Sequence, residues 1–367
     1  MNINKKSDKP DTTYRLLSPL GWNDYFQVQM ETKTDGDLTP ARVIGVRKNF
    51  FSVSSGDEEL LCTLAGRFHR DVGGVYPVVG DWVLVKDTVI SRVLVRQNAL
   101  SRGASGNRDK QDAQPQREQI LAANLDTVFI VSGLDRDFNL RRIERYLTLV
   151  YNCGLNPVIL LTKADLHRDP SQFVSDAEGI AFGVPVYPMS ATDDDGLSVL
   201  APYLTPGATT TMIGSSGAGK STLINRLCGR TVQRTSAIST VVNKGRHTTT
   251  SRDMIRLPNG GLVIDNPGIR EIAFWENDGG IDAVFPEIEA LSRDCRFSDC
   301  SHTHEPGCRV SEAVESGDIS ESRMANYRKM RRELAYIAQS KNKSADRVEK
   351  ERWKGVALKI KAMKKGR

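Results

Sequence analysis

Residues 214–221 read GSSGAGKS and follow the run TTTMI at residues 209–213. Their spacing, G-x-x-x-x-G-K-[ST], is that of the P-loop, a glycine-rich turn that joins a strand to a helix. Backbone N–H groups of this turn and the N-terminus of the helix bind phosphate oxygens. Lys220 is expected to reach the β- and γ-phosphates, and the Ser221 hydroxyl to coordinate Mg²⁺. The stretch predicts a nucleoside triphosphate site; a Gly/Ser turn without a ligand is the alternative.

Apolar strands alternate with helical segments on both sides of this turn. Strands are expected near residues 126–132, 157–162, 184–188, 209–213, 254–257 and 261–265, with helices around residues 140–150 and 220–228. Continuous apolar strands separated by helices are typical of a parallel sheet covered on both faces. We therefore expect an α/β domain over residues 116–275.

A second motif, Thr162-Lys163-Ala164-Asp165, follows directly after an apolar strand. It resembles the guanine-specificity motif [NT]-K-x-D of GTPases. A carboxylate at Asp165 can accept hydrogen bonds from both N1–H and N2–H of guanine, a pair of donors that adenine lacks. Ser190-Ala191, after the next strand, fits the companion loop that contacts guanine O6. Taken alone, the same aspartate could simply cap a helix.

Asp265-Asn266-Pro267-Gly268 resembles the D-x-x-G motif of switch II, and residues 245–250, GRHTTT, occupy the place of switch I. Asp265 is expected to hold Mg²⁺ through water, the Gly268 N–H to meet the γ-phosphate, and Thr250, or else Thr249, to coordinate Mg²⁺. A threonine-rich loop without a nucleotide role is the alternative. The residues expected to bind nucleotide or Mg²⁺ are Thr162, Lys163, Asp165, Ser190, Ala191, Gly214, Ser215, Ser216, Gly217, Ala218, Gly219, Lys220, Ser221, Thr222, Thr250, Asp265 and Gly268.

Three of the six cysteines cluster with a histidine in the pattern Cys295-x4-Cys300-x-His302-x5-Cys308. Three thiolates and one imidazole form the Cys3His set of a closed tetrahedral Zn²⁺ site, which leaves no position for a substrate. The sequence predicts one structural zinc ion, with His304 as a rival ligand and reduced free cysteines as the alternative.

Residues 39–115 contain short β-rich runs at 42–46, 50–54, 60–64, 82–86 and 89–95, separated by Gly, Asp and Asn turn signals. About five strands suit a small barrel, either an OB-fold, which we favour, or a barrel of the SH3 kind. Residues 1–38 lack periodicity and are expected to be a flexible arm, and residues 101–118 a polar linker. Residues 276–340, which include the cysteines, are expected to form a zinc-binding, mostly helical domain.

The 367 residues carry a net charge of +6, but residues 341–367 hold 11 basic and three acidic side chains. This tail therefore has a charge of +8, and the other 340 residues sum to −2. A polyanion such as RNA suits such a tail, although a basic amphipathic helix can also bind a membrane or a partner protein. No apolar run reaches the ~18 residues of a spanning helix, and no secretory signal is visible, so we expect a cytoplasmic protein without membrane attachment.

In GTPases of ordinary order the P-loop precedes the base motif, whereas here residues 162–165 precede residue 214. This order predicts a circularly permuted GTPase domain. With the preceding barrel and the following cysteine cluster, residues 40–340 resemble the ribosome small-subunit-dependent GTPase A (RsgA) family, and the C-x-H spacing matches that family's pattern. The resemblance implies a multidomain GTP hydrolase that binds GTP and GDP, is stimulated by the small (30S) ribosomal subunit and acts late in its maturation. It also implies contact with rRNA, and we expect a monomer.

Ile269 stands where Ras-like proteins place a catalytic glutamine, and an isoleucine cannot orient a water molecule. Slow intrinsic hydrolysis is therefore expected. His247, beside the switch I threonines, is the candidate catalytic residue together with Lys220 and Thr250; a solvent-exposed loop histidine is the alternative. Two other functions remain open at this level: an RNA-binding assembly scaffold with incidental turnover, and a P-loop ATPase or kinase, which the T-K-x-D segment disfavours.

Overall fold

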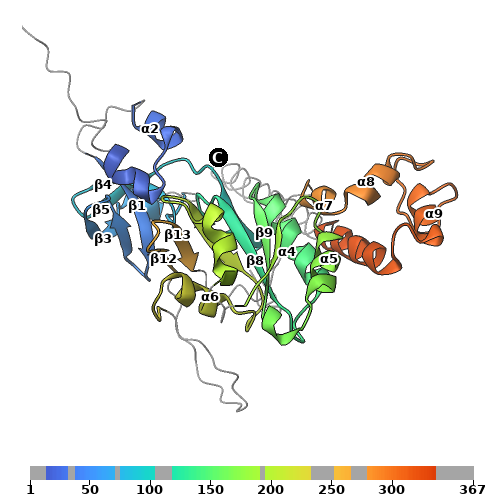
Figure 1. Ribbon diagram of the computed structural model, residues 1–367. Coiled ribbons are helices and arrows are strands. Elements are labelled where there is room, and N and C mark those ends of the chain that lie inside the picture. Colours follow the sequence, from blue (N-terminus) through green and yellow to red (C-terminus); the bar gives the residue numbers. More distant parts are fainter. Residues whose placement is uncertain are drawn as a thin grey trace, which may run out of the picture. The chain divides into compact units, whose positions relative to one another are not determined.

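The computed structural model describes residues 14–31, 38–70, 75–103, 118–190, 195–232, 252–265 and 279–335 (Figure 1). The chain divides into two compact units, one formed by Met1–Ser101 with Ile120–Arg270, the other by Arg102–Gln119 with Glu271–Arg367. The predicted barrel and nucleotide domain thus fall within one unit, and the boundary expected between them stays a prediction.

Five strands near the N-terminus close into a barrel. They are β1 (Thr39–Val46), β2 (Phe51–Ser54), β3 (Glu59–Leu64), β4 (Trp82–Lys86) and β5 (Val89–Val93), with the short helix α3 (Arg67–Arg70) between β3 and β4. The strands pair in the order β1-β2-β3-β5-β4, and β4 returns to β1. The β3–β5 pair is parallel and the others are antiparallel. This closed five-stranded circuit is the OB-fold that the sequence favoured over an SH3-like barrel.

The segment before the barrel corrects one expectation. Residues 14–17 are helical and are followed by η1 (Ser18–Leu20) and α2 (Asp24–Glu31). Trp22 and Phe26 are buried against Trp82 of β4, and the two tryptophan rings meet edge to face at 4.7 Å between centroids. The prediction of a flexible arm is therefore wrong for residues 14–31, because their apolar side chains cover the barrel although their spacing follows no period.

A mainly parallel sheet forms the rest of the first unit (Figure 1). Its strands are β8 (Thr127–Gly133), β9 (Pro157–Thr162), β10 (Val186–Pro188), β11 (Thr209–Ile213), β12 (Arg252–Arg256) and β13 (Leu262–Asp265). They run in the order β10-β9-β8-β11-β13-β12, with only β12 antiparallel to its neighbour, and β12 also pairs with β1 of the barrel. The five parallel strands therefore end at one edge of the sheet.

Helices cover both faces of this sheet, as the alternating sequence predicted. They are α4 (Leu140–Asn152), α5 (Ser171–Glu178) and α6 (Lys220–Leu227), with the 3-10 segments η2 (Ala164–Leu166) and η3 (Asp195–Tyr203). Phe129 and Val131 pack with Leu223 and Ile224 of α6. Ile130, which points to the opposite face, is also fully buried. Burial on both faces accounts for the uninterrupted apolar character of β8.

Besides the pairing of β1 with β12, a buried arginine joins the barrel to the parallel sheet. Arg42 of β1 is 1% exposed and donates to Gly80 O (3.2 Å), Asn124 O (3.0 Å), Thr209 Oγ1 (2.8 Å) and Leu20 O. Burial lowers the pKa of its guanidinium to about 10, against the opposing effect of Asp126 and Asp81. It therefore stays charged at neutral pH and ties the barrel to the first residue of β11.

The second unit is helical where it is described after residue 278. It contains α7 (Gly279–Val284), α8 (Pro286–Ser292), α9 (Arg309–Ser316) and the helical residues 321–335. Phe285, Ile288, Val310 and Met330 form its buried interior. This agrees with the mostly helical domain expected there; the basic tail lies outside the described residues.

The linker predicted for residues 101–118 is bordered by a pair of short strands. These are β6 (Ala99–Gly103) and β7 (Glu118–Ala123), which pair as a two-stranded sheet. Residues 104–117 lie outside the described part. Within the described ranges, no helix has the length and apolar character needed to cross a membrane.

Candidate functional site

The P-loop lies at the carboxyl edge of the sheet, between β11 and α6. A Cβ on Gly214 would stand 2.2 Å from Val131 O, so only glycine lets the loop pass this close to β8. Gly217 and Gly219 adopt positive φ values of 86° and 94°, which glycine reaches without strain. The turn that the spacing predicted is therefore built as a tight backbone curve leading into a helix N-terminus.

Lys220 is held against this curve. Its Nζ donates to Gly214 O at 2.7 Å and to Ser215 O at 2.5 Å. Ser221 and Thr222 follow in the first turn of α6, where backbone N–H groups have no partner within the helix. An ammonium group and unsatisfied N–H donors meet here, and both attract phosphate oxygens.

The T-K-x-D segment is bonded directly to the P-loop. Thr162, the last residue of β9, is 1% exposed and its Oγ1 donates to Ala218 O at 2.6 Å. Asp165 follows within η2, and the Ala164 N–H donates to Met189 O at 3.1 Å, next to Ser190. The structure thus brings the expected base motif, the P-loop and the residue after β10 to one edge; Ala191 lies outside the described residues.

Asp265 is the last residue of β13, which runs parallel to β11 with Ile264 opposite Thr211. This register places Asp265 at the end of β13, on the same edge of the sheet as the P-loop that follows β11. The other residues predicted for the switch segments, namely His247, Thr249, Thr250, Gly268 and Ile269, lie outside the described residues.

Two further acidic residues, which the sequence reasoning missed, lie in the loop after β8. Asp135 Oδ2 accepts a hydrogen bond from Lys163 Nζ at 2.5 Å. Burial by itself raises the pKa of Asp135, but the hydrogen bond and charge of Lys163 outweigh it and lower this pKa. Asp137 accepts from the Ser215 hydroxyl and forms an ion pair with Arg142 of α4. One loop therefore contacts both the base motif and the P-loop.

Lys163 is held in an unusual conformation by these contacts. Its φ is +61°, in the left-handed region that residues with a Cβ rarely occupy. A Cβ on Gly133 would lie 3.4 Å from Lys163 Cδ and 3.0 Å from Asp135 Oδ1. The sequence signal that could have identified Asp135 is its position just beyond a parallel strand, where ligands of α/β sheets bind.

A second site lies in the other unit, around the clustered cysteines. The ligand atoms of Cys295, Cys300, His302 and Cys308 all lie within 4.8 Å of one another, so the group could hold a metal ion. Cys295 Sγ is 3.8 Å from Cys308 Sγ, and His302 Nδ1 is 3.7 Å and 3.4 Å from these two sulfurs. Zn–S bonds of ~2.3 Å at tetrahedral angles separate two sulfurs by about 3.8 Å. The spacing of these donors therefore fits a tetrahedral ion; His304 is not a member of the group.

The local fold favours the metal-binding form of Cys308 and fixes the loop that carries His302. Cys308 is the N-cap of α9 and accepts a hydrogen bond from the Ser311 N–H at 3.4 Å. Although burial raises the pKa of Cys308, the hydrogen bonds from Ser311 and His302 lower it to about 6. This favours the thiolate, which is the form that binds metals. Arg328 donates to the backbone carbonyl of His302 and holds the loop in place.

The chain is similar to known GTPases along most of its length. The RsgA GTPase family model matches residues 93–275. A protein of Opitutus terrae named small ribosomal subunit biogenesis GTPase RsgA is 43% identical over an alignment of 357 positions, which covers 93% of this chain and 95% of the relative. The crystal structure of YjeQ from Thermotoga maritima is similar with a TM-score of 0.58 and 31% identity, over 81% of this chain and 99% of that one.

The fold of YloQ, described as a circularly permuted GTPase, is also similar, with a TM-score of 0.54 and 22% identity over 85% of this chain and 98% of that one. In this chain β8 and β9 precede β11 in the sequence, and β8 lies between β9 and β11 in the sheet. This chain combines a barrel, a parallel sheet with a P-loop and a Cys3His cluster, and it matches the relative from Opitutus terrae over 95% of that protein's length. The chain belongs to the RsgA family of GTPases.

Proposed function

We propose that this protein hydrolyses GTP in response to the small ribosomal subunit and acts late in the maturation of that subunit. The observation that carries the GTPase part is the hydrogen bond of 2.6 Å from Thr162 Oγ1 to Ala218 O. It joins a base-reading segment to a phosphate-binding loop, so that one nucleotide can contact both. The names of the relatives support the ribosomal part.

Within this proposal each residue has a defined task. The Asp165 carboxylate accepts from N1–H and N2–H of guanine, and the Lys163 stem covers the base. Lys220 and the loop N–H groups neutralise phosphate charge. Ser221, Thr250 and Asp265 would hold Mg²⁺, which supplies further neutralisation when bound, and the Gly268 N–H would meet the γ-phosphate.

Hydrolysis also requires a group that orients water. Because Ile269 has no polar atom for this, we assign the task to His247 once the subunit has ordered its loop. Replacing His247 by alanine should remove subunit-stimulated turnover while GTP affinity stays within twofold. Unchanged stimulated turnover in this variant would refute the assignment.

The Cys3His group would hold one structural Zn²⁺. Four protein donors fill a tetrahedral shell, so the ion would stabilise the loop between α8 and α9 without taking part in turnover. We assign rRNA contact to the basic tail and the OB-fold. A monomer is expected because one site on the subunit takes one copy of the protein. The cytoplasm is the expected location.

The decisive experiment measures hydrolysis of GTP and of ATP by the full chain, with and without purified small subunits. Stimulation of GTP turnover alone is expected. A Lys220→Ala variant, which lacks the phosphate-binding ammonium, is the control for contaminating hydrolases. Preference for ATP would refute the base assignment, and binding to the subunit without stimulation would instead support an assembly scaffold.

A further inference from the structure

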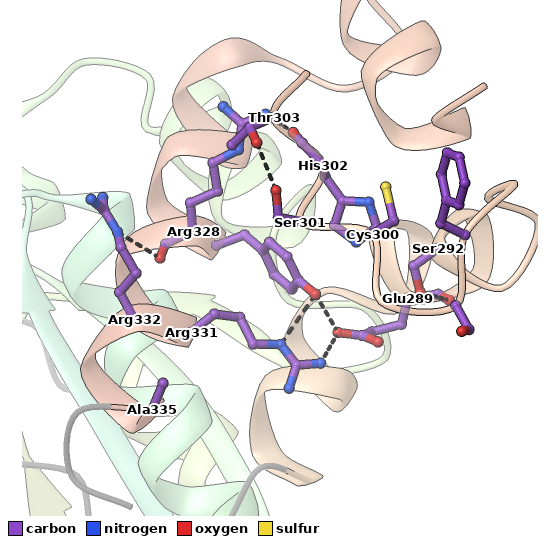
Figure 2. A pocket seen from close by; sticks show the side chains of 13 residues that line it. Glu289, Ser292, Cys300, Ser301, His302, Thr303, Arg328, Arg331, Arg332 and Ala335 are labelled. Carbon is purple, nitrogen blue, oxygen red and sulfur yellow. Dashed lines mark hydrogen bonds and ion pairs between the residues drawn. The ribbon is translucent and has the colours of Figure 1, made fainter. Parts of the chain in front are cut away.

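A cavity of about 730 Å³ lies inside the second unit, between the Cys/His loop and helical residues 321–335 (Figure 2). Phe297 and Thr303 line it from the loop, and Arg328, Arg331 and Arg332 line it from the helix. Its volume is within the range of small-molecule binding sites, roughly 300–1,000 Å³. The residues of the proposed GTP site lie in the other unit, so none of them lines this cavity.

The three arginines of the cavity differ in how their charge is balanced. Arg331 forms ion pairs with Glu289 and with Asp282, and it donates to the Tyr327 hydroxyl. Figure 2 shows the pair with Glu289. Among the described residues, Arg328 donates only to the backbone carbonyl of His302, and Arg332 only to the backbone carbonyl of Arg328. In the described residues of this unit no carboxylate pairs with either of them. Two guanidinium charges of the cavity thus have no balancing anion.

Two more observations point to the kind of ligand. Arg328 Nε is buried and has no hydrogen-bond acceptor in the described residues, so a bound acceptor would satisfy a costly orphan donor. Phe297 remains 41% exposed, although a phenyl ring normally prefers burial. A ligand that offers both an anionic oxygen and a flat apolar face matches these features.

We propose that the cavity binds one unpaired nucleotide of RNA, with its base on the Phe297 ring and its flanking phosphates at Arg328 and Arg332. Stacking on aromatic side chains together with arginine contacts to phosphate is how proteins hold single-stranded RNA. The inference rests on the proposed function, because a ribosomal subunit presents such nucleotides.

The charge of residues 279–335 favours a single nucleotide over a broad RNA face on this part of the chain. Residues 279–335 contain eight basic and 11 acidic side chains, so this region as a whole repels a polyanion. Within it, the cavity brings together two guanidinium groups, Arg328 and Arg332, that have no ion pair among the described residues. The Arg296 guanidinium carbon lies 5.5 Å from the centroid of the Phe297 ring, yet the residue stays 41% exposed. An acidic peptide would satisfy the guanidinium groups but would offer no flat face to the exposed part of this ring.

The test uses the full-length, zinc-loaded protein and a fluorescein-labelled octamer of single-stranded oligouridine, with affinity followed by anisotropy over a range of salt concentrations. The variant Arg328→Gln/Arg332→Gln should weaken binding at least tenfold. It should also reduce the slope of log K against log salt concentration by about 1.4 in magnitude, since each phosphate contact to a single strand contributes ~0.7. The matched control Arg293→Gln/Arg309→Gln removes the same charge from exposed positions outside the cavity. It should change affinity by no more than twofold.

Base recognition is tested separately with an octamer that lacks one central base. The wild type should bind this octamer about fivefold or more weakly than the complete one, and the Phe297→Ala variant should not distinguish the two. Zinc content equal to that of the wild type shows that a variant is folded.

Equal losses for the cavity variant and its control would overturn the proposal. So would a labelled oligoglutamate that binds the wild type and is lost only in the cavity variant, because the ligand would then be an acidic protein segment. Subunit-stimulated GTP hydrolysis is measured in parallel. Its absence in the wild type would refute the proposed function, whereas normal stimulation with unchanged RNA affinity would refute only the cavity.

Discussion

Replacing Arg42 by methionine should destabilise the first unit strongly, because the arginine is buried and holds segments far apart in the chain. The variant keeps an apolar stem beside Trp82, whose ring centroid lies 5.5 Å from the guanidinium carbon. It leaves three buried acceptors without this donor, namely Leu20 O, Asn124 O and Thr209 Oγ1. Gly80 O keeps the hydrogen bond from Asn124 Nδ2 at 2.9 Å. An orphaned buried acceptor costs at least ~1 kcal/mol, so the free energy of unfolding should fall by about 3 kcal/mol or more. Loss of one member of a buried charged network typically costs about 3–5 kcal/mol.

For a unit of this size, 1 kcal/mol corresponds to about 2–4 °C, so the midpoint of thermal unfolding should fall by about 6–12 °C. Tryptophan fluorescence can follow the transition, since Trp22 and Trp82 lie in the cluster next to Arg42. The matched control is Arg47→Met on the same strand. Arg47 pairs with Asp253 at 2.6 Å, but the two side chains are 48% and 41% exposed, and such a pair contributes less than about 1 kcal/mol.

The midpoint of the Arg47 variant should therefore fall by less than about 4 °C. If the two variants shift the midpoint equally, the buried network does not stabilise the junction and the reasoning fails. An Arg42→Lys variant should fall between the wild type and the methionine variant, because one ammonium group retains the charge but cannot reach all four acceptors.

Other substitutions test the two sites. Asp165→Asn should weaken binding of fluorescent GDP about tenfold or more, since it removes a charge-assisted pair of hydrogen bonds to guanine; unchanged affinity contradicts the base assignment. Asp135→Asn should weaken GDP binding by up to about fivefold, and in a Lys163→Met background it should have no further effect, because the carboxylate acts through that lysine. Thr162→Val keeps the volume but removes the bond to the P-loop, which should weaken GTP binding about fivefold or more in the same assay. Cys308→Ser should reduce bound zinc below one per chain and make the second unit sensitive to protease, while GDP affinity stays unchanged; normal zinc content would contradict the ligand set.

Local patterns of the sequence determined much of this protein. The P-loop depends on glycines and a lysine within eight residues, and a strand such as β9 on the apolar run PVILL, so both can be predicted from neighbouring residues. The four donors of the metal cluster lie within 14 residues. Three thiolates and one imidazole by themselves favour Zn²⁺ over other ions. The order of the base motif and the P-loop along the chain was sufficient to predict the permutation.

The tertiary structure alone decided how distant segments meet. Trp22 follows no period, and its burial depends on Trp82, which lies 60 positions away. Asp135 and Asp137, in the loop after β8, accept hydrogen bonds from Lys163 and from Ser215 of the P-loop because the sheet places these segments side by side. Arg42 donates a hydrogen bond to Thr209, which lies 167 positions later in the chain. Periodicity and spacing report only interactions between near neighbours in the chain, whereas these contacts depend on how strands pair and on which side chains the paired strands bring together.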